Sequence, residues 1–111
     1  MVAAANVQRG DVFLVSLDPT QGSEIQKTHP CVIVSPDELN AHMRTCIVAP
    51  MTTASRSYPF RISCQFQGKS GHVVLDQIRT VDRHRLVKKL GQLSSQALDK
   101  SLQVLAEMFS P

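Results

Sequence analysis

The sequence predicts a mainly β fold, in which a small curled sheet or barrel of short strands is followed by one C-terminal helix. Several short segments rich in β-branched residues stand close together, one segment alternates strictly between apolar and polar residues, and the last repeats apolar residues at helical spacing. The chain has 111 residues, of which 42% are hydrophobic, enough for one domain with a modest core. We expect an N-terminal tail over residues 1–8 and a single domain over residues 9–111.

The first three strands are predicted from apolar runs. Residues 11–17 form a near-continuous apolar run, which is typical of a short strand buried on both faces. Residues 31–34 and 45–49 are rich in β-branched side chains. The intervening residues 20–30 are polar and include Gly22, so we expect a long loop there. Loops of that length in a small domain are usually functional.

A short helix is predicted between the second and third strands. Ser35 is a good N-cap, Pro36 suits the first helical position, and Glu38 stands three residues after Ser35. Serine followed at this distance by glutamate forms a capping box, in which the two side chains bond to backbone N–H groups at the helix start. We therefore expect the helix to begin at Pro36.

Residues 60–67 give the clearest strand signal in the second half of the chain. Apolar side chains alternate with polar ones there, as in an antiparallel strand with one buried face. Residues 68–71 are interpreted as a hairpin turn into a fifth strand over residues 72–75. A sixth short strand is expected near residues 87–93.

The chain is predicted to end in an amphipathic helix whose N-cap is Ser94 or Ser95. The apolar residues that recur at helical spacing are Leu98, Leu102, Leu105 and Phe109. This stripe is expected to pack on the sheet.

The positive charge of the chain is concentrated in its middle. The formal net charge is +3, yet residues 51–90 contain eight Lys or Arg residues against two Asp, a local charge of +6. A basic segment suits a polyanionic partner, and it suits a solvated, solubilising surface equally well. Charge alone therefore does not choose between the two interpretations.

The cysteines and the apolar segments indicate a cytoplasmic protein. Cys31, Cys46 and Cys64 are odd in number and lie within apolar runs, which favours reduced, buried thiols in a reducing compartment. The first residues do not resemble a secretory signal, and no segment approaches the length of a membrane span. We expect no contact with a membrane.

Several kinds of site are not supported by the spacing of the residues. The four His and three Cys residues show no zinc-ligand spacing, the glycines form no phosphate-binding pattern, and each cysteine lies among aliphatic neighbours rather than beside a catalytic partner. We expect neither a metal nor a cofactor.

Three polar segments at strand ends carry the candidate chemistry. They contribute Glu24, Lys27, Thr28 and His29 before the second strand, Thr52, Thr53, Ser55 and Arg56 after the third, and Asp76, Gln77 and Arg79 after the fifth. A curled sheet can bring these segments together at one end. Their side chains then suit RNA cleavage without metal, which needs a base for the ribose 2′-OH, cations for the phosphorane and an acid for the 5′-oxygen. The alternative is that they cap and solvate strand ends.

Four ordered motifs resemble the MazF/PemK/Kid family of toxins. Residues 9–24 are similar to its opening pattern of R-G-D/E, an apolar run, and P-x-x-G-S/H-E. Residues 30–36 resemble its Arg-Pro strand, residues 48–53 its V-x-P-x-T-T/S segment, and residues 75–82 its D/E-Q-x-R/K segment. The motifs occur in order at near-family spacing and the resemblance covers about residues 9–109.

The resemblance implies a small SH3-like β-barrel of the MazF/PemK/CcdB type with a C-terminal helix. It further implies the toxin of a type II toxin–antitoxin system, a homodimer that cleaves single-stranded RNA, including mRNA, at a short sequence without metal. A cognate MazE-like antitoxin is expected to place a disordered tail in the RNA groove.

The family motifs assign candidate roles to individual residues. Thr52 corresponds to a threonine that helps to hold the scissile phosphate, and Glu24 to the acidic residue of the opening motif, so both are catalytic candidates together with His29. The candidate RNA-binding residues are Lys27, Thr28, Thr53, Ser55, Arg56, Asp76, Gln77 and Arg79. Among these, Lys27 and Arg56 are assigned by position rather than by motif.

One departure concerns the position before Pro30. The family has an arginine there, which serves as acid or base and as phosphate anchor, whereas this chain has His29. An imidazole either performs proton transfer itself or weakens or inactivates the enzyme by removing a permanent charge. We expect the second, so that His29→Arg raises the cleavage rate. Val74 also replaces an arginine of the Kid branch, so the catalytic scheme of that branch is not transferred.

Two other functions compete with ribonuclease activity. A module on the same fold that binds RNA or antitoxin without catalysis would need no reactive geometry. A gyrase-directed toxin on a related barrel would leave RNA intact, but the Glu24 loop and residues 76–79 resemble the ribonuclease branch. We therefore expect an endoribonuclease.

Overall fold

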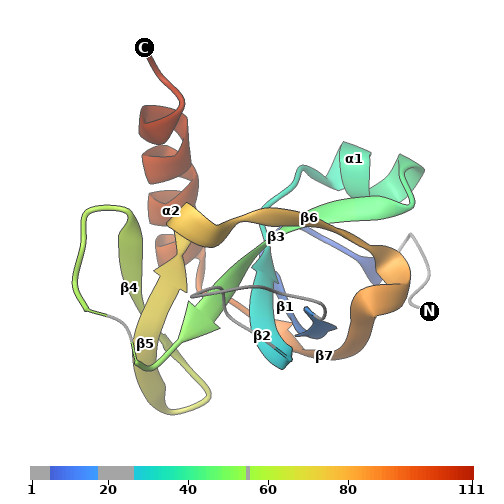
Figure 1. Ribbon diagram of the computed structural model, residues 1–111, viewed down its shortest axis with the longest axis horizontal. Coiled ribbons are helices and arrows are strands. Elements are labelled where there is room, and N and C mark those ends of the chain that lie inside the picture. Colours follow the sequence, from blue (N-terminus) through green and yellow to red (C-terminus); the bar gives the residue numbers. More distant parts are fainter. Residues whose placement is uncertain (1–5, 18–26, 55) are drawn as a thin grey trace.

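The computed structural model describes residues 6–17, 27–54 and 56–111. Within these residues the chain forms a curled antiparallel sheet with one long helix at its C-terminal end (Figure 1). The strands are β1 (Asp11–Ser16), β2 (Thr28–Ile33), β3 (Thr45–Thr52), β4 (Arg61–Phe66), β5 (Lys69–Val74), β6 (Arg79–Asp82) and β7 (Leu86–Gln92), and the helices are α1 (Asp37–His42) and α2 (Ser95–Met108). The predicted fold class, a mainly β protein in which a small curled sheet or barrel is followed by a C-terminal helix, is confirmed.

The long strand β3 holds the two parts of the sheet together. The strand order is β4-β5-β3-β2-β1-β7, and β6 pairs with β3 outside this path. The start of β3 pairs with β6, its middle with β2, and only its last two residues, Met51 and Thr52, with β5. The β4–β5 hairpin therefore leaves the rest of the sheet at the end of β3 (Figure 1).

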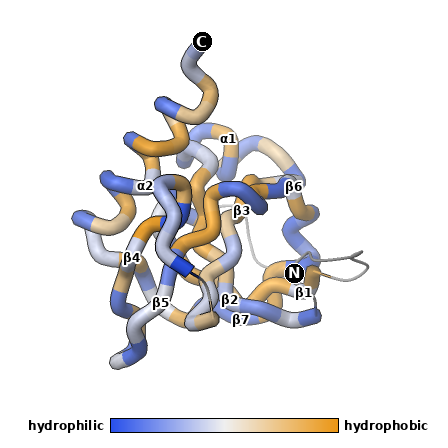
Figure 2. Tube along the Cα trace, turned by 60° about the vertical axis from the view of Figure 1, so that its left-hand side comes forward, coloured by the Kyte–Doolittle hydropathy of each residue, from blue (hydrophilic) through white to orange (hydrophobic). Residues whose placement is uncertain are grey.

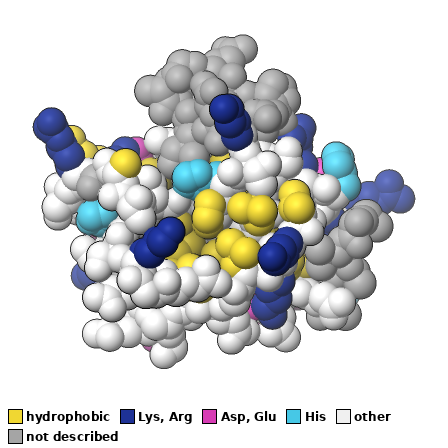
Figure 3. Space-filling model, turned by 90° about the horizontal axis from the view of Figure 1, so that it is seen from below, with side chains coloured by type: hydrophobic (Ala, Val, Ile, Leu, Met, Phe, Trp, Pro, Cys, Tyr) yellow, Lys and Arg dark blue, Asp and Glu magenta, His cyan; other side chains and the backbone are white. Residues whose placement is uncertain are grey.

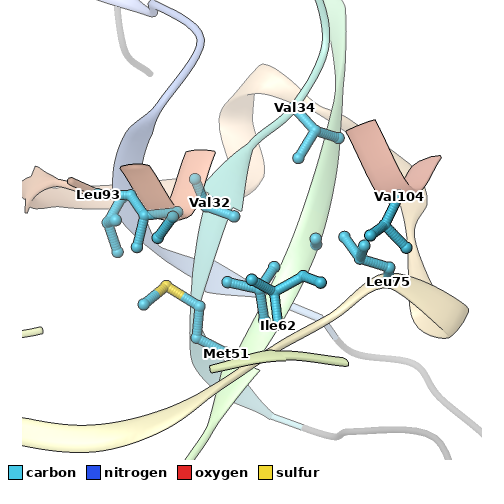
Figure 4. Packing of buried hydrophobic residues seen from close by; sticks show 11 residues of the cluster. Val32, Val34, Met51, Ile62, Leu75, Leu93 and Val104 are labelled. Carbon is cyan, nitrogen blue, oxygen red and sulfur yellow. The ribbon is translucent and has the colours of Figure 1, made fainter. Parts of the chain in front are cut away.

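The sheet buries apolar side chains on both faces. One cluster contains Val12, Val32 and Ala49 and is covered by Val104 of α2 (Figure 4). The other contains Phe13, Val15 and Cys31. Because successive side chains of β1 enter different clusters, the prediction of a first strand buried on both faces is confirmed. Val7 also packs in the second cluster, although the sequence places it in the expected N-terminal tail.

The C-terminal helix begins as predicted and ends differently. The Ser94 hydroxyl accepts a hydrogen bond from the Ala97 N–H at 3.2 Å, which confirms Ser94 as N-cap. Apolar and polar residues alternate around α2 (Figure 2), but its buried residues are Ala97, Ser101 and Val104. Phe109 is 72% exposed, so its predicted place in the packed stripe is wrong, because the helix ends at Met108 and runs past the sheet.

The predicted capping box of α1 is wrong. The N-cap is Pro36 and has no side-chain bond. Instead, the Ser35 hydroxyl donates to the side-chain carbonyl of Asn40 and accepts from the Ile47 N–H at 3.0 Å. Ser35 therefore joins α1 to β3 rather than capping the helix, a role that depends on a contact twelve residues away along the chain.

The predicted β4–β5 hairpin is confirmed, but its turn lies earlier than expected. Gln67 and Gly68 have φ of 52° and 78°, and Phe66 pairs directly with Lys69, as in a two-residue turn with a left-handed backbone. Residues 69–71, expected in the turn, lie in β5.

Two further strand boundaries differ from the sequence prediction. Thr28–Pro30, expected in a loop, belongs to β2, and residues 20–26 of that loop lie outside the described residues. The sixth strand predicted near residues 87–93 is β7, whereas β6, a strand of four residues of which two are charged, was not predicted. No helix in the described ranges is long and apolar enough to cross a membrane.

Candidate functional site

A cavity of ≈ 320 Å³ lies where β3 passes from β2 to β5. Its apolar lining includes Pro30, Met51, Phe66 and Leu90. Figure 3, which views the molecule from the side where the β4–β5 hairpin turns, shows hydrophobic side chains in a hollow bordered by basic and histidine side chains. The polar residues that line the cavity are His29, Thr52, Thr53, Gln67, Lys69 and His72. It combines an apolar floor with hydrogen-bond donors.

His29 is held in one orientation by the backbone of β3. It lies on β2 opposite Val15, and its Nε2 is hydrogen-bonded to the Met51 carbonyl oxygen. A carbonyl oxygen only accepts, so the ring hydrogen is on Nε2. When the ring is neutral, Nδ1 is therefore unprotonated and cannot donate to an anion.

Thr52 is the last residue of β3 and has a hydroxyl hydrogen available for donation. Its Oγ1 accepts a hydrogen bond from the Ala54 N–H at 3.1 Å. A hydroxyl that accepts one bond still has its own hydrogen to donate. Thr52 lines the cavity together with His29, so the structure brings together two of the three predicted catalytic residues. The third, Glu24, lies outside the described residues.

His72 also lines this cavity and was not identified from the sequence. It is the direct cross-strand partner of Thr52 and of Ser63. The sequence offers a weak signal, a histidine between Gly71 and the apolar residues 73–75, and no spacing relates it to His29 or Thr52. The register of β5 against β3 creates the relationship.

A second cavity of ≈ 940 Å³ adjoins the first between the β4–β5 hairpin and the start of α2. Its polar lining includes Ser63, Gln65, Ser94 and Lys100. Both cavities are lined by Thr53, Cys64, Gly71 and His72. These four residues thus form the boundary between them.

The third predicted segment does not line the first cavity. Asp76 faces Arg61, with Nε–Oδ1 and Nη2–Oδ2 distances both 3.1 Å. The hydrogen bond from Arg61 lowers the pKa of the Asp76 carboxyl below its ordinary value of 3.8. Arg79 donates to the Leu17 carbonyl oxygen at 3.2 Å, and Gln77 is half-buried in the short 3-10 helix η2 (Leu75–Gln77). The expectation that all three polar segments meet holds for the first two only.

Of the remaining predicted RNA-binding residues that the structure describes, Thr53 lines the first cavity, and Lys27, Thr28 and Arg56 are not among its lining residues. Thr28 begins β2 opposite Ser16, and the Lys27 carbonyl accepts from the Leu17 N–H at 3.0 Å. Lys27, Thr28, Thr53 and Arg56 are exposed, whereas Ser55 lies outside the described residues.

The three cysteines are free, protonated thiols in the folded protein. Burial raises the pKa of Cys31 to about 12, and it also raises the pKa of Cys46 and Cys64. Across the described ranges, no three His, Cys, Asp or Glu side chains form a group able to hold a metal ion.

Comparison with known proteins identifies the family. The endoribonuclease toxin MazF of Escherichia coli K12 is 33% identical over 99 residues, which cover 88% of this chain and 89% of that protein. A Deinococcus radiodurans MazF structure shares the fold with a TM-score of 0.79 and 24% identity, covering 91% of this chain and 94% of its own. A mycobacterial endoribonuclease solved with its cognate antitoxin has a TM-score of 0.76 and 25% identity over 90% of this chain and 91% of its own. Residues 8–109 match the model of the family described as the PemK-like, MazF-like toxin of type II toxin–antitoxin systems, and the chain belongs to that family.

Proposed function

We propose that this chain is a metal-independent endoribonuclease toxin that cleaves single-stranded RNA, including mRNA. The observation that carries the proposal is the position of the Thr52 hydroxyl in the open cavity beside His29. The E. coli relative, aligned over most of both chains, is named an endoribonuclease toxin. The fold and the residues of the site are thus suited to the same class of substrate.

The proposed reaction is an internal transfer of the phosphoryl group. The ribose 2′-oxygen forms a bond to phosphorus while the bond from phosphorus to the 5′-oxygen breaks. The 2′-OH proton is taken by a base, and the 5′-oxygen receives a proton, which leaves a cyclic phosphate and a 5′-hydroxyl. Thr52 donates to a non-bridging oxygen of the phosphorane, and Lys69 supplies positive charge at the same cavity. Glu24 is assigned to proton transfer by its motif.

His29 explains why the reaction is expected to be slow. Its Nε2–H is engaged by the Met51 carbonyl, so the neutral ring has no donor for the phosphate. An arginine at this position carries a permanent charge and several donors. The proposed role of His29 is therefore a weakened replacement of the family's arginine at the catalytic position.

RNA on either side of the scissile phosphate is proposed to follow the exposed edge of the site. Lys27, Thr28, Thr53 and Arg56 are exposed, Thr53 lines the cavity, and Ser55 is included because it stands between Thr53 and Arg56 in the sequence. Arg79 bonds to the backbone at the end of β1. We assign Arg79, Asp76 and Gln77 to the support of this edge and to contacts with more distant nucleotides.

The partners are proposed from the same family. The mycobacterial relative is described in complex with its cognate antitoxin. We propose that a MazE-like antitoxin covers the cavity of this chain, that two copies form a homodimer, and that the protein acts in the cytoplasm. The reduced state expected of three free cysteines agrees with that compartment.

Incubation of the protein with a long single-stranded RNA, with and without a chelator, tests the proposed function. Discrete fragments that form equally in both samples are expected, and Thr52→Val should slow their appearance. Intact RNA that nonetheless binds the protein would replace the enzyme with a non-catalytic binding module. Intact RNA together with poisoned topoisomerase would instead indicate a gyrase-directed toxin.

A further inference from the structure

His72 lines both cavities of the site, and one of its ring nitrogens is buried. Its Nδ1 is buried and has no hydrogen-bond partner among the residues that the structure describes. The residue is nevertheless half-exposed and forms part of the lining of both cavities. One edge of the ring, at Nδ1, is thus enclosed by protein, and the accessible part of the residue lies on the side of the cavities that it lines. Such an arrangement calls for an explanation, because buried polar atoms are normally satisfied.

The environment of the ring favours one tautomer. A hydrogen on Nδ1 would be a buried donor without an acceptor, and an unsatisfied buried donor is costly. A hydrogen on Nε2 places the donor at the accessible edge of the ring and leaves an acceptor at the buried Nδ1, and unpaired buried acceptors are less rare in proteins than unpaired buried N–H donors. The neutral ring therefore presents an N–H donor, Nε2–H, on the side that opens to the cavities.

The backbone fixes His72 beside the residue proposed to hold the phosphate. Thr52 and His72 are direct partners in the β3–β5 pair, and side chains of such partners lie on the same face, with Cβ atoms about 5 Å apart. Gly71 packs so closely on Thr52 that a Cβ atom built on it would lie 2.5 Å from the Thr52 carbonyl oxygen. This contact allows little movement between the two strands.

We propose that His72 is a further substrate-binding residue, whose Nε2–H donates a hydrogen bond to an oxygen of the RNA phosphate held by Thr52. The proposal rests on the proposed function. In this proposal His72 supplies a neutral N–H donor for the phosphate. His29 cannot supply one, since its Nε2–H is bonded to the Met51 carbonyl. The two histidines of the cavity thus differ in chemistry: one is engaged by the protein, and the other is free for the substrate.

A neutral donor makes a specific prediction about pH. The titratable groups that line the two cavities with His72 are His29 from β2, Cys64 from β4, Lys69 from β5 and Lys100 from α2. All of them remain in a His72 variant. The ratio of wild-type to variant rate therefore isolates His72, and for a neutral donor this ratio does not fall as the pH rises. An imidazolium acid would instead give a ratio that falls toward one as the pH rises.

The test compares three substitutions by single-turnover cleavage of one fluorescent RNA at saturating protein. His72→Phe keeps the ring but has no donor, and its rate should fall by about 10²-fold, as for other deleted transition-state donors. In His72→Gln, the amide nitrogen can occupy the position of Nε2, so its rate should remain within about tenfold of wild type. In His72→Asn, the amide reaches only the position of Nδ1, so it should be as slow as His72→Phe. His42→Gln, an exposed change on α1, serves as the matched control.

The results distinguish a His72 side chain that contacts the RNA from one that only packs within the protein. The proposal is supported if His72→Phe and His72→Asn cleave slowly, His72→Gln keeps most of the wild-type rate, and the ratio of wild-type to variant rate does not fall as the pH rises. Equal loss in all three variants, or wild-type rates in His72→Phe, would overturn it, as would a ratio that falls with rising pH. Thermal unfolding of each variant identifies a variant that fails to fold. If the wild-type protein leaves RNA intact, the proposed function fails instead, which is a distinguishable outcome.

Discussion

Gly71 lies so close to the backbone of Thr52 that no residue with a Cβ atom would fit at position 71 without backbone movement. A Cβ atom at residue 71 would lie 2.5 Å from the Thr52 carbonyl oxygen and 3.2 Å from its carbonyl carbon. Both atoms belong to the backbone, so no side-chain rotation can relieve the contact. The close packing of β5 on the proposed phosphate-binding end of β3 therefore depends on glycine at position 71.

Gly71→Ala should displace the end of β3 and reduce cleavage. The added methyl group forces backbone movement, which typically costs about 1–3 kcal/mol of stability. We expect a lower unfolding midpoint in urea together with a slower single-turnover rate. Ser70→Ala, an exposed change on the same strand, should leave both unchanged, and an unaltered rate in Gly71→Ala would show that the position of Thr52 is not critical.

Thr52→Val should slow cleavage while preserving the fold. Valine has nearly the shape of threonine but removes the hydroxyl donor, so we expect a loss of about 10²-fold, whereas Thr52→Ser should stay within about tenfold. The comparison is made by single-turnover cleavage with matched RNA. Thr80→Val, at an exposed position on β6, is the control. Equal rates for the valine and serine variants would contradict a role for the hydroxyl.

His29→Arg should raise the cleavage rate by about 10² to 10³ at about pH 7. The neutral imidazole donates its one ring hydrogen to Met51, whereas arginine adds a fixed charge and further donors for the phosphorane. His42→Arg adds the same charge on exposed α1 and should have little effect. A rate equal to or below wild type would mean that His29 itself transfers a proton.

The pair of Arg61 and Asp76 should make stability depend on acid pH. The hydrogen bond from Arg61 lowers the pKa of Asp76 in the folded protein below 3.8, so this contribution is present above about pH 4 and is lost as the pH falls through the lowered value. Asp76→Asn should therefore reduce the free energy of unfolding by less than about 1 kcal/mol at neutral pH. The difference from wild type should vanish in strong acid.

Urea unfolding followed by circular dichroism over a pH series measures this dependence. Asp99→Asn, an exposed change on α2, should leave the pH dependence unaltered. A difference between Asp76→Asn and wild type that persists unchanged in strong acid would show that the carboxylate charge is not its source.

The protein should be a homodimer at micromolar concentration. A domain of this size hides only part of its apolar surface, and Met43, Val87 and Phe109 are more than half exposed. Association of two copies would cover apolar surface of this kind. Light scattering should return twice the chain mass of 12.2 kDa, and a monomer mass throughout the micromolar range would contradict the prediction.

The sequence by itself determined the fold class, the family and part of the site. Alternation over residues 60–67 and the Ser94 cap are local patterns, and the structure places β4 and α2 where they indicate. Ordered motifs likewise identified Thr52 and the departure at His29, because each motif is read within a few neighbouring residues. These features depend little on the arrangement of distant segments.

Only the tertiary structure decided which polar residues meet. Asp76 follows a motif but is bonded to Arg61, fifteen residues earlier in the chain, instead of lining the cavity. Ser35 bonds across to β3 rather than capping α1, and His72 stands beside Thr52 through the register of β5 on β3. Register and hairpin placement depend on the simultaneous packing of two cores, a long-range balance that no local pattern encodes.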